Sequence, residues 1–177
     1  MRKSVFAFLL SGIVFTACGG DPETEANDPV SEPVEETTAP AEEAEPAEEV
    51  EMEVAEIVIE GNDQMKYNLS EIRVKAGQTV KLTLKHVGTM DVAVMGHNWI
   101  LLDNGVTKDD FGMEAISAKE SGYIPAKYAD KVIANTDLIG GGDETTIEFT
   151  APAAGTYTYM CSFPGHFGAM HGSFIVE

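Results

Sequence analysis

Strict alternation of apolar and polar residues from Ile57 onward most constrains the fold of this chain. In "EIRVKAGQTVKLTLKHVG" (71–88) apolar side chains occupy every second position, and "KAGQ" interrupts the pattern as a turn. Further short runs follow: "HNWILLDNG", "TTIEFTAPAAG", "TYTYMCSF" and "GSFIVE". Side chains of a strand point alternately to its two faces, so these runs indicate half-buried strands. We predict an all-β fold, a two-sheet antiparallel Greek-key β-sandwich of seven to eight strands.

One stretch departs from this alternation. "KDDFGMEAISAK" (108–119) has a helix-compatible composition and an acidic start. We therefore expect one helical excursion at about 106–130, between strands. A segment of about 120 residues is long enough to enclose one sandwich core, so residues 56–177 are predicted to form a single domain.

Residues 18–55 have a different composition. The sequence from 19 to 56 holds fifteen acidic residues and no Lys or Arg, and it is rich in Ala, Glu and Pro. Such a segment buries too little apolar surface to offset its ordering entropy, so a disordered acidic tether is expected. The chain has a formal charge of −19. It offers no basic surface to neutralise phosphates, which excludes a nucleic-acid partner.

The N-terminus indicates export. Two basic residues precede the apolar run "VFAFLLSGIVF" (5–15), and Ala17 stands just before Cys18. This arrangement resembles a bacterial lipoprotein signal (1–17), which predicts acylation of Cys18 and attachment to the periplasmic or outer-membrane face of the cell envelope. An ordinary signal peptide cleaved near Ala17, or a retained membrane anchor, are the alternatives.

The second cysteine lies in a loop with other metal-binding side chains. "CSFPGHFGAM" places Cys161, His166 and Met170 in a C-x4-H-x3-M spacing between two predicted strands. Thiolate, imidazole and a weak thioether suit a copper ion that cycles between Cu(I) and Cu(II). A trigonal site needs a second histidine, and "VMGHNW" supplies His97 directly after Gly96.

Four segments together resemble the azurins, small blue copper proteins of the cupredoxin fold. They are "GNDQM" (61–65), "VMGHNW" (94–99), "VIANTDLIGGGDE" (132–144) and "CSFPGHFGAMHG" (161–172). The acidic tether adds a resemblance to the lipoprotein azurins. The family's disulfide is absent, because the corresponding positions hold Ala55 and Gly77.

The resemblance implies a site for one copper ion and a function for it. The implied ligands are His97, Cys161 and His166, with Met170 as a weak axial ligand and the Gly96 carbonyl opposite it. Asn98 and Phe163 are expected beside the ligands. Electrons are expected to pass through His166, within an apolar patch. The residues assigned to this patch are Met65, Met95, Met113, Gly168 and Ala169; for the three methionines, ordinary packing is the alternative.

The sequence thus predicts a monomeric one-electron carrier, not an enzyme. Its expected partners are redox proteins such as a c-type cytochrome, an oxidase or a reductase. The alternative is a periplasmic copper-storage protein without redox cycling, although no clustered Met-x-x-Met run is present. An enzyme with Cys161 as nucleophile lacks an adjacent orienting carboxylate. A zinc site is disfavoured because a thioether is a poor zinc ligand.

Overall fold

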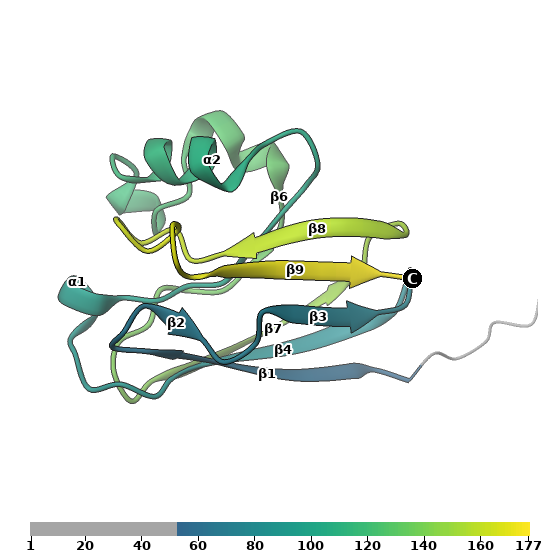
Figure 1. Ribbon diagram of the computed structural model, residues 1–177, viewed down its shortest axis with the longest axis horizontal. Coiled ribbons are helices and arrows are strands. Elements are labelled where there is room, and N and C mark those ends of the chain that lie inside the picture. The colour runs from purple at the N-terminus through teal and green to yellow at the C-terminus, as the bar shows by residue number, and fades with distance from the viewer. Residues whose placement is uncertain (1–52) are drawn as a thin grey trace, which may run out of the picture. The chain divides into compact units, whose positions relative to one another are not determined.

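The computed structural model describes residues 53–177. Within this range two sheets pack face to face (Figure 1). One sheet has the order β2-β1-β4-β7 and the other has the order β3-β9-β8-β5-β6. The strands are β1 (Ala55–Asn62), β2 (Lys66–Tyr67), β3 (Glu71–Val74), β4 (Thr79–His86), β5 (Ile100–Leu102), β6 (Val132–Asn135), β7 (Glu144–Thr150), β8 (Gly155–Met160) and β9 (His171–Val176).

The sandwich core follows the alternation read from the sequence. In β4, Val80, Leu82 and Leu84 are fully buried, and the residues between them are exposed or half-buried. They pack with Trp99 and Phe174, which are also fully buried, in one apolar cluster. The predicted all-β sandwich is therefore confirmed, although residues 53–177 form nine strands and not the seven to eight predicted.

Strand direction differs from the prediction in two places. β1 runs parallel to β4, with Ala55 opposite Val80 and Gly61 opposite His86, and β3 runs parallel to β9. The prediction of a purely antiparallel sandwich is therefore wrong. Period-two alternation fixes which face of a strand is buried, but it carries no information on the direction of the neighbouring strand.

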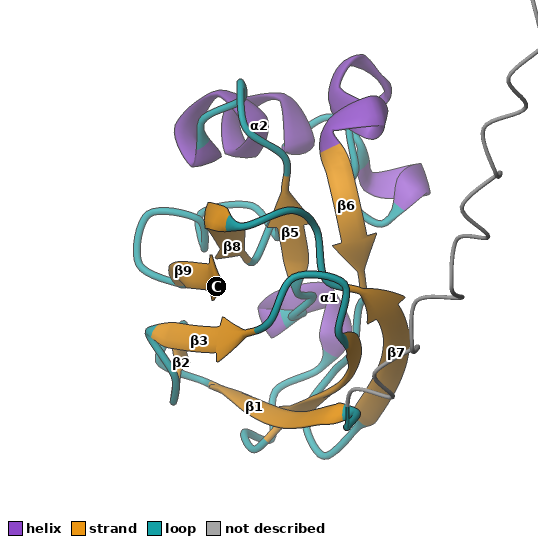
Figure 2. Cartoon of the chain, turned by 90° about the vertical axis from the view of Figure 1, so that its right-hand side faces the viewer, coloured by secondary structure: helices purple, strands orange, loops and turns teal. Residues whose placement is uncertain are grey.

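The helical excursion lies where it was expected. Helix α2 (Lys108–Ala115) begins after Thr107, whose hydroxyl accepts a hydrogen bond from the Asp110 amide. Two 3₁₀ helices follow, η1 (Lys119–Ser121) and η2 (Ala126–Lys131). Figure 2 shows these helices gathered beside β5 and β6. In the described part of the chain, no helix has the length and apolar character needed to cross a membrane.

A second, smaller cluster of buried residues joins the helical excursion to the sandwich. Phe111 and Ala115 of α2 pack in it with Met160, Cys161 and Met170. Helix α1 (Val92–Met95), which the sequence did not reveal, precedes Gly96. The loop that joins β8 to β9 lies at the same end of the sandwich as α1 (Figure 1). Residues 161–170 are therefore held between the ends of the strands and α2.

Candidate metal centre

Three potential metal ligands from two separate segments meet inside the domain. His97 lies between α1 and β5, and Cys161 and His166 lie in the β8–β9 loop. Their ligand atoms all lie within 4.8 Å of one another. The Cys161 sulfur is 3.5 Å from Nδ1 of His166. His97 and Cys161 are fully buried, whereas His166 retains 2% exposure. This makes His166 the one member of the three that reaches solvent.

The ring of His97 is oriented by a backbone carbonyl. Its Nε2 lies 3.0 Å from the Asn62 oxygen at the end of β1. The other ring nitrogen, Nδ1, lies 3.0 Å from a second carbonyl, that of Gly96. Burial lowers the pKa of His97, which favours the neutral ring with a proton on one nitrogen only. In the tautomer that donates from Nε2 to Asn62, the lone pair of Nδ1 is free to bind a cation.

Gly96 brings a second lone-pair atom to the same place. Its carbonyl oxygen lies 3.0 Å from Nδ1 of His97 and 3.9 Å from the sulfur of Cys161. A Cβ at Gly96 would come within 2.6 Å of the Val92 oxygen and 3.0 Å of the Phe163 ring. Glycine is thus required here for space, as the sequence suggested. In the tautomer protonated at Nε2, the Gly96 carbonyl and Nδ1 of His97 would present two lone pairs to the same place, which suits a cation.

Met170 adjoins the same cluster. It is fully buried, and its carbonyl accepts a hydrogen bond of 2.9 Å from the Cys161 amide. A Cβ at Gly61 would lie 2.7 Å from both the Met170 methyl and the His97 ring. The end of β1 therefore packs directly behind these two side chains. Neither Gly61 nor Asn62 was assigned a role from the sequence, since one acts by having no side chain and the other through its backbone.

Asn98 links the two ligand-bearing segments. Its Oδ1 accepts a hydrogen bond of 2.9 Å from the Ser162 amide, and its Nδ2 donates to the Ser162 hydroxyl at 2.9 Å. The hydroxyl of Tyr67 donates to the Asn98 carbonyl at 2.5 Å. Asn98 follows His97 and Ser162 follows Cys161, so this pairing holds the two segments in register. Phe163 packs against His166, with ring centroids 4.7 Å apart.

Burial governs protonation in the metal-free site. It raises the pKa of the Cys161 thiol to about 12 and lowers the pKa of His166 to about 4. At neutral pH the site therefore holds one thiol and neutral imidazoles. These are soft and borderline ligands, and with a thioether beside them they suit copper better than zinc or a hard cation.

The residues expected to form the apolar patch lie in different environments. Met65 and Met95 are half-buried, while Met113, Gly168 and Ala169 are exposed. Further exposed apolar side chains come from α1, α2 and their flanks: Met90, Val92, Val94 and Ile116. The other two histidines lie outside the cluster of candidate ligands. His86 is buried and stacks on His97, and His171 is exposed.

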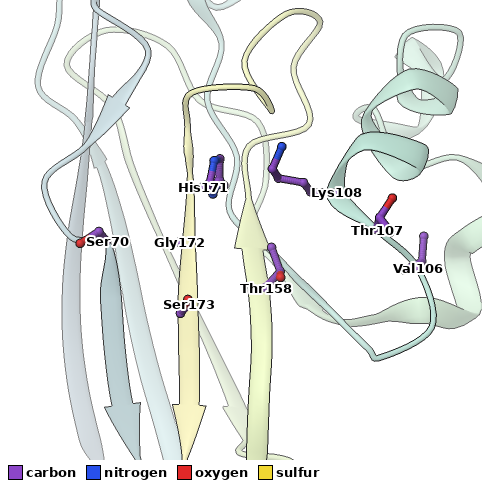
Figure 3. A pocket seen from close by; sticks show the side chains of 8 residues that line it. All are labelled: Ser70, Val106, Thr107, Lys108, Thr158, His171, Gly172 and Ser173. Carbon is purple, nitrogen blue, oxygen red and sulfur yellow. The ribbon is translucent and has the colours of Figure 1, made fainter.

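A separate hollow of about 510 Å³ lies between α2 and the β8–β9 pair (Figure 3). None of the candidate metal ligands lines it. Its lining residues are Ser70, Val106, Thr107, Lys108, Thr158, His171, Gly172 and Ser173. The candidate ligands themselves are buried.

A cupredoxin sandwich with a buried His-Cys-His cluster and an adjacent methionine is typical of a type 1 copper protein. The family model of copper-binding proteins, plastocyanin/azurin family, matches residues 53–177. This chain belongs to that family. It is an azurin-like protein, copper is its cofactor, and it is a cupredoxin-type electron carrier.

Individual relatives agree with this assignment. Azurin of Achromobacter denitrificans is 41% identical over 67% of this chain and 81% of that protein. Outer membrane protein H.8 of Neisseria gonorrhoeae is 40% identical over 64% of this chain, which spans only 63% of that protein.

Among solved structures, auracyanin A, a "blue" copper protein of Chloroflexus aurantiacus, is 33% identical with a TM-score of 0.64, over 71% of this chain and all of that one. The azurin of Methylomonas sp. strain J is 33% identical with a TM-score of 0.62, and the match covers 70% of this chain and 98% of that azurin.

Proposed function

We propose that this chain carries single electrons between membrane-associated or periplasmic redox partners, with His97, Cys161 and His166 as the equatorial ligands of one copper ion. Met170 is the weak axial ligand, and the Gly96 carbonyl lies on the other side. The observation that carries the proposal is the buried convergence of one thiol and two imidazoles within 4.8 Å. When bound, copper supplies the Cu(I)/Cu(II) couple.

The chain contributes a fixed ligand geometry. Asn62 sets the orientation of the His97 ring through one hydrogen bond, and Asn98 ties the His97 segment to the Cys161 segment. Because these partners are themselves buried or held by strands, little rearrangement accompanies a change in charge at the site. A rigid site of this kind favours fast electron transfer over chemistry that makes or breaks bonds.

His166 is the proposed port for electrons. It is the one equatorial candidate with any exposure, and exposed apolar residues stand on α1 and α2. Weak electron-transfer encounters bury comparatively little surface, and a small exposed apolar patch suits such a contact with another redox protein. A c-type cytochrome, an oxidase or a reductase fits this description. We extend the patch Met65, Met95, Met113, Gly168 and Ala169 to include Met90 and Val94.

We also propose that the protein is exported and anchored by lipid at Cys18, with residues 18–55 as tether and 56–177 as the copper domain. Cys18 lies outside the described residues, so this part depends on the sequence. The similarity to a protein named outer membrane protein H.8 supports a place in the cell envelope. Copper storage is the less favoured alternative, because the donor atoms are buried rather than presented in an open array.

The test compares the purified protein with its Cys161→Ser variant after addition of Cu(II). Visible absorption and electron paramagnetic resonance are recorded, followed by reduction with a c-type cytochrome in a stopped-flow instrument. An intense blue band with a small copper hyperfine splitting, lost in the variant, and rapid reduction are expected. A colourless copper-loaded protein would refute the thiolate site. A blue protein that exchanges no electrons would favour storage.

A further inference from the structure

Helix α2 contains a glycine in its interior, a position at which glycine ordinarily destabilises a helix. Gly112 is the fifth of its eight residues and is buried. A glycine inside a helix costs about 1 kcal/mol relative to alanine. In so short a helix, this cost calls for a compensating contact at position 112.

The side chain that occupies the space beside Gly112 comes from the β8–β9 loop (residues 161–170), here called the copper loop. The ring of Phe167 lies against Gly112, and a Cβ added there would be 2.3, 2.4 and 2.7 Å from three ring atoms. No real Cβ is found so close to another heavy atom, so the ring can take this position only over a glycine. Phe167 follows His166 directly and is half-buried against the cluster that holds Cys161 and Met170.

Internal backbone hydrogen bonds connect Phe163, His166 and Met170 within this loop. The His166 amide donates to the Phe163 carbonyl at 3.0 Å, and the Met170 amide donates to the His166 carbonyl at 2.8 Å. A displacement of Phe167 is therefore transmitted to His166 on one side and toward Met170 on the other.

We infer that Gly112 and Phe167 form a positioning contact, through which α2 holds the loop from His166 to Met170 in its metal-binding arrangement. The copper part of this inference rests on the ligand roles proposed above. The contact itself concerns the metal-free chain and is measurable there. Phe167 and Gly112 act through the ligands and do not touch the metal.

The test uses Gly112→Ala, Phe167→Leu and the double variant, with Gly155→Ala as control. A Cβ at Gly155 would make only ordinary contacts, the nearest at 3.5 Å, and Gly155 begins β8, whose opposite end leads to Cys161. In the metal-free proteins, the modification rate of Cys161 by a thiol reagent is followed by peptide mass spectrometry, which separates it from Cys18. In the copper-loaded proteins, copper affinity, the blue band and the reduction potential are measured.

Gly112→Ala is expected to accelerate Cys161 modification, to shift the reduction potential and to weaken copper binding by about tenfold. In the double variant, the smaller and more flexible leucine side chain gives way to the new methyl group. The double variant is therefore expected to match Phe167→Leu rather than to add the two effects. Gly155→Ala should match the unchanged protein. If Gly112→Ala does not fold, the rescue by Phe167→Leu remains the deciding comparison.

Two results would overturn the positioning contact: a Gly112→Ala protein identical to the unchanged one in Cys161 reactivity and potential, or strictly additive effects in the double variant. Failure of the ligand assignment is recognised separately. It would appear as the absence of a blue band in the unchanged protein, whereas Cys161 reactivity in the metal-free variants would still report on the contact.

Discussion

Asn98 and Ser162 are joined by two hydrogen bonds of 2.9 Å, although 64 positions separate them in the sequence. Each follows a candidate ligand, so the pair acts as a buried clamp between the two halves of the metal site. Asn98→Ala would leave the buried Ser162 amide without its acceptor. We expect the free energy of unfolding to fall by about 1–3 kcal/mol and copper affinity to fall by about 10–100-fold, measured by denaturant titration and copper competition.

Asn68 provides the matched control for this change. Its Oδ1 also accepts a backbone hydrogen bond, from Glu60 at 2.8 Å, but it does so at the surface. Water can replace the lost acceptor there, so Asn68→Ala should change stability by at most about 0.5 kcal/mol. Equal losses in the two variants would contradict the proposed clamp.

Copper binding is expected to release about one proton per ion at pH 7. Burial raises the pKa of the Cys161 thiol to about 12 and lowers the pKa of both His97 and His166. Only the thiol therefore has a proton to lose on binding. Affinity should rise about tenfold per pH unit at neutral to alkaline pH. Calorimetry in buffers of different ionisation enthalpy measures the release. A value near zero would show that the thiol does not bind as thiolate.

The metal-free protein should lose stability in mild acid because of His166. Burial lowers its pKa from 6.5 to about 4 in the folded state. Between these values the unfolded chain binds more protons than the folded one, so protonation favours unfolding. The free energy of unfolding should reach its full value above about pH 6.5 and should fall as the pH is lowered toward 4, by on the order of 3 kcal/mol. Denaturant titrations across this range, with His166→Gln as a non-titrating comparison, measure the change. If the free energy of unfolding of both proteins changes with pH in the same way, His166 is not the cause of the loss of stability in acid.

Trp99 gives an independent probe of the core. It is the single tryptophan of the chain and is fully buried, and its indole N–H has no hydrogen-bond partner within residues 53–177. Buried indole N–H groups ordinarily find a partner. We expect strongly blue-shifted fluorescence that is insensitive to iodide and moves to the red on unfolding. Emission typical of a solvated indole would mean that water reaches this ring.

The sequence was informative where a side chain itself performs the task. The spacing of Cys161, His166 and Met170 identified the copper loop, and Gly96 was recognised as a point of close approach. The sequence was silent where the backbone acts, as at Asn62, whose carbonyl any residue could supply. Helix α1 was also missed, because four residues rich in Val carry little helical signal and depend on the cap at Asp91.

Contacts between distant segments were equally invisible to the sequence. Nothing in the sequence links Phe167 to Gly112, and only the folded chain brings them together. The parallel pairing of β1 with β4 was missed for the same reason, since alternation does not identify the partner strand.

β1, which pairs in parallel with β4, runs from the end of the domain where the N-terminal segment enters to the end that carries the candidate ligands. β1 enters at Ala55 and reaches the ligands only at Gly61 and Asn62. The seven steps from Ala55 to Asn62, at about 3.3 Å each, separate the two ends of β1 by about 23 Å. A membrane attachment through the N-terminus would pull on one pole of the sandwich, while the copper end remains free at the other. The proposed membrane attachment and the proposed docking of a redox partner would therefore use opposite ends of the domain.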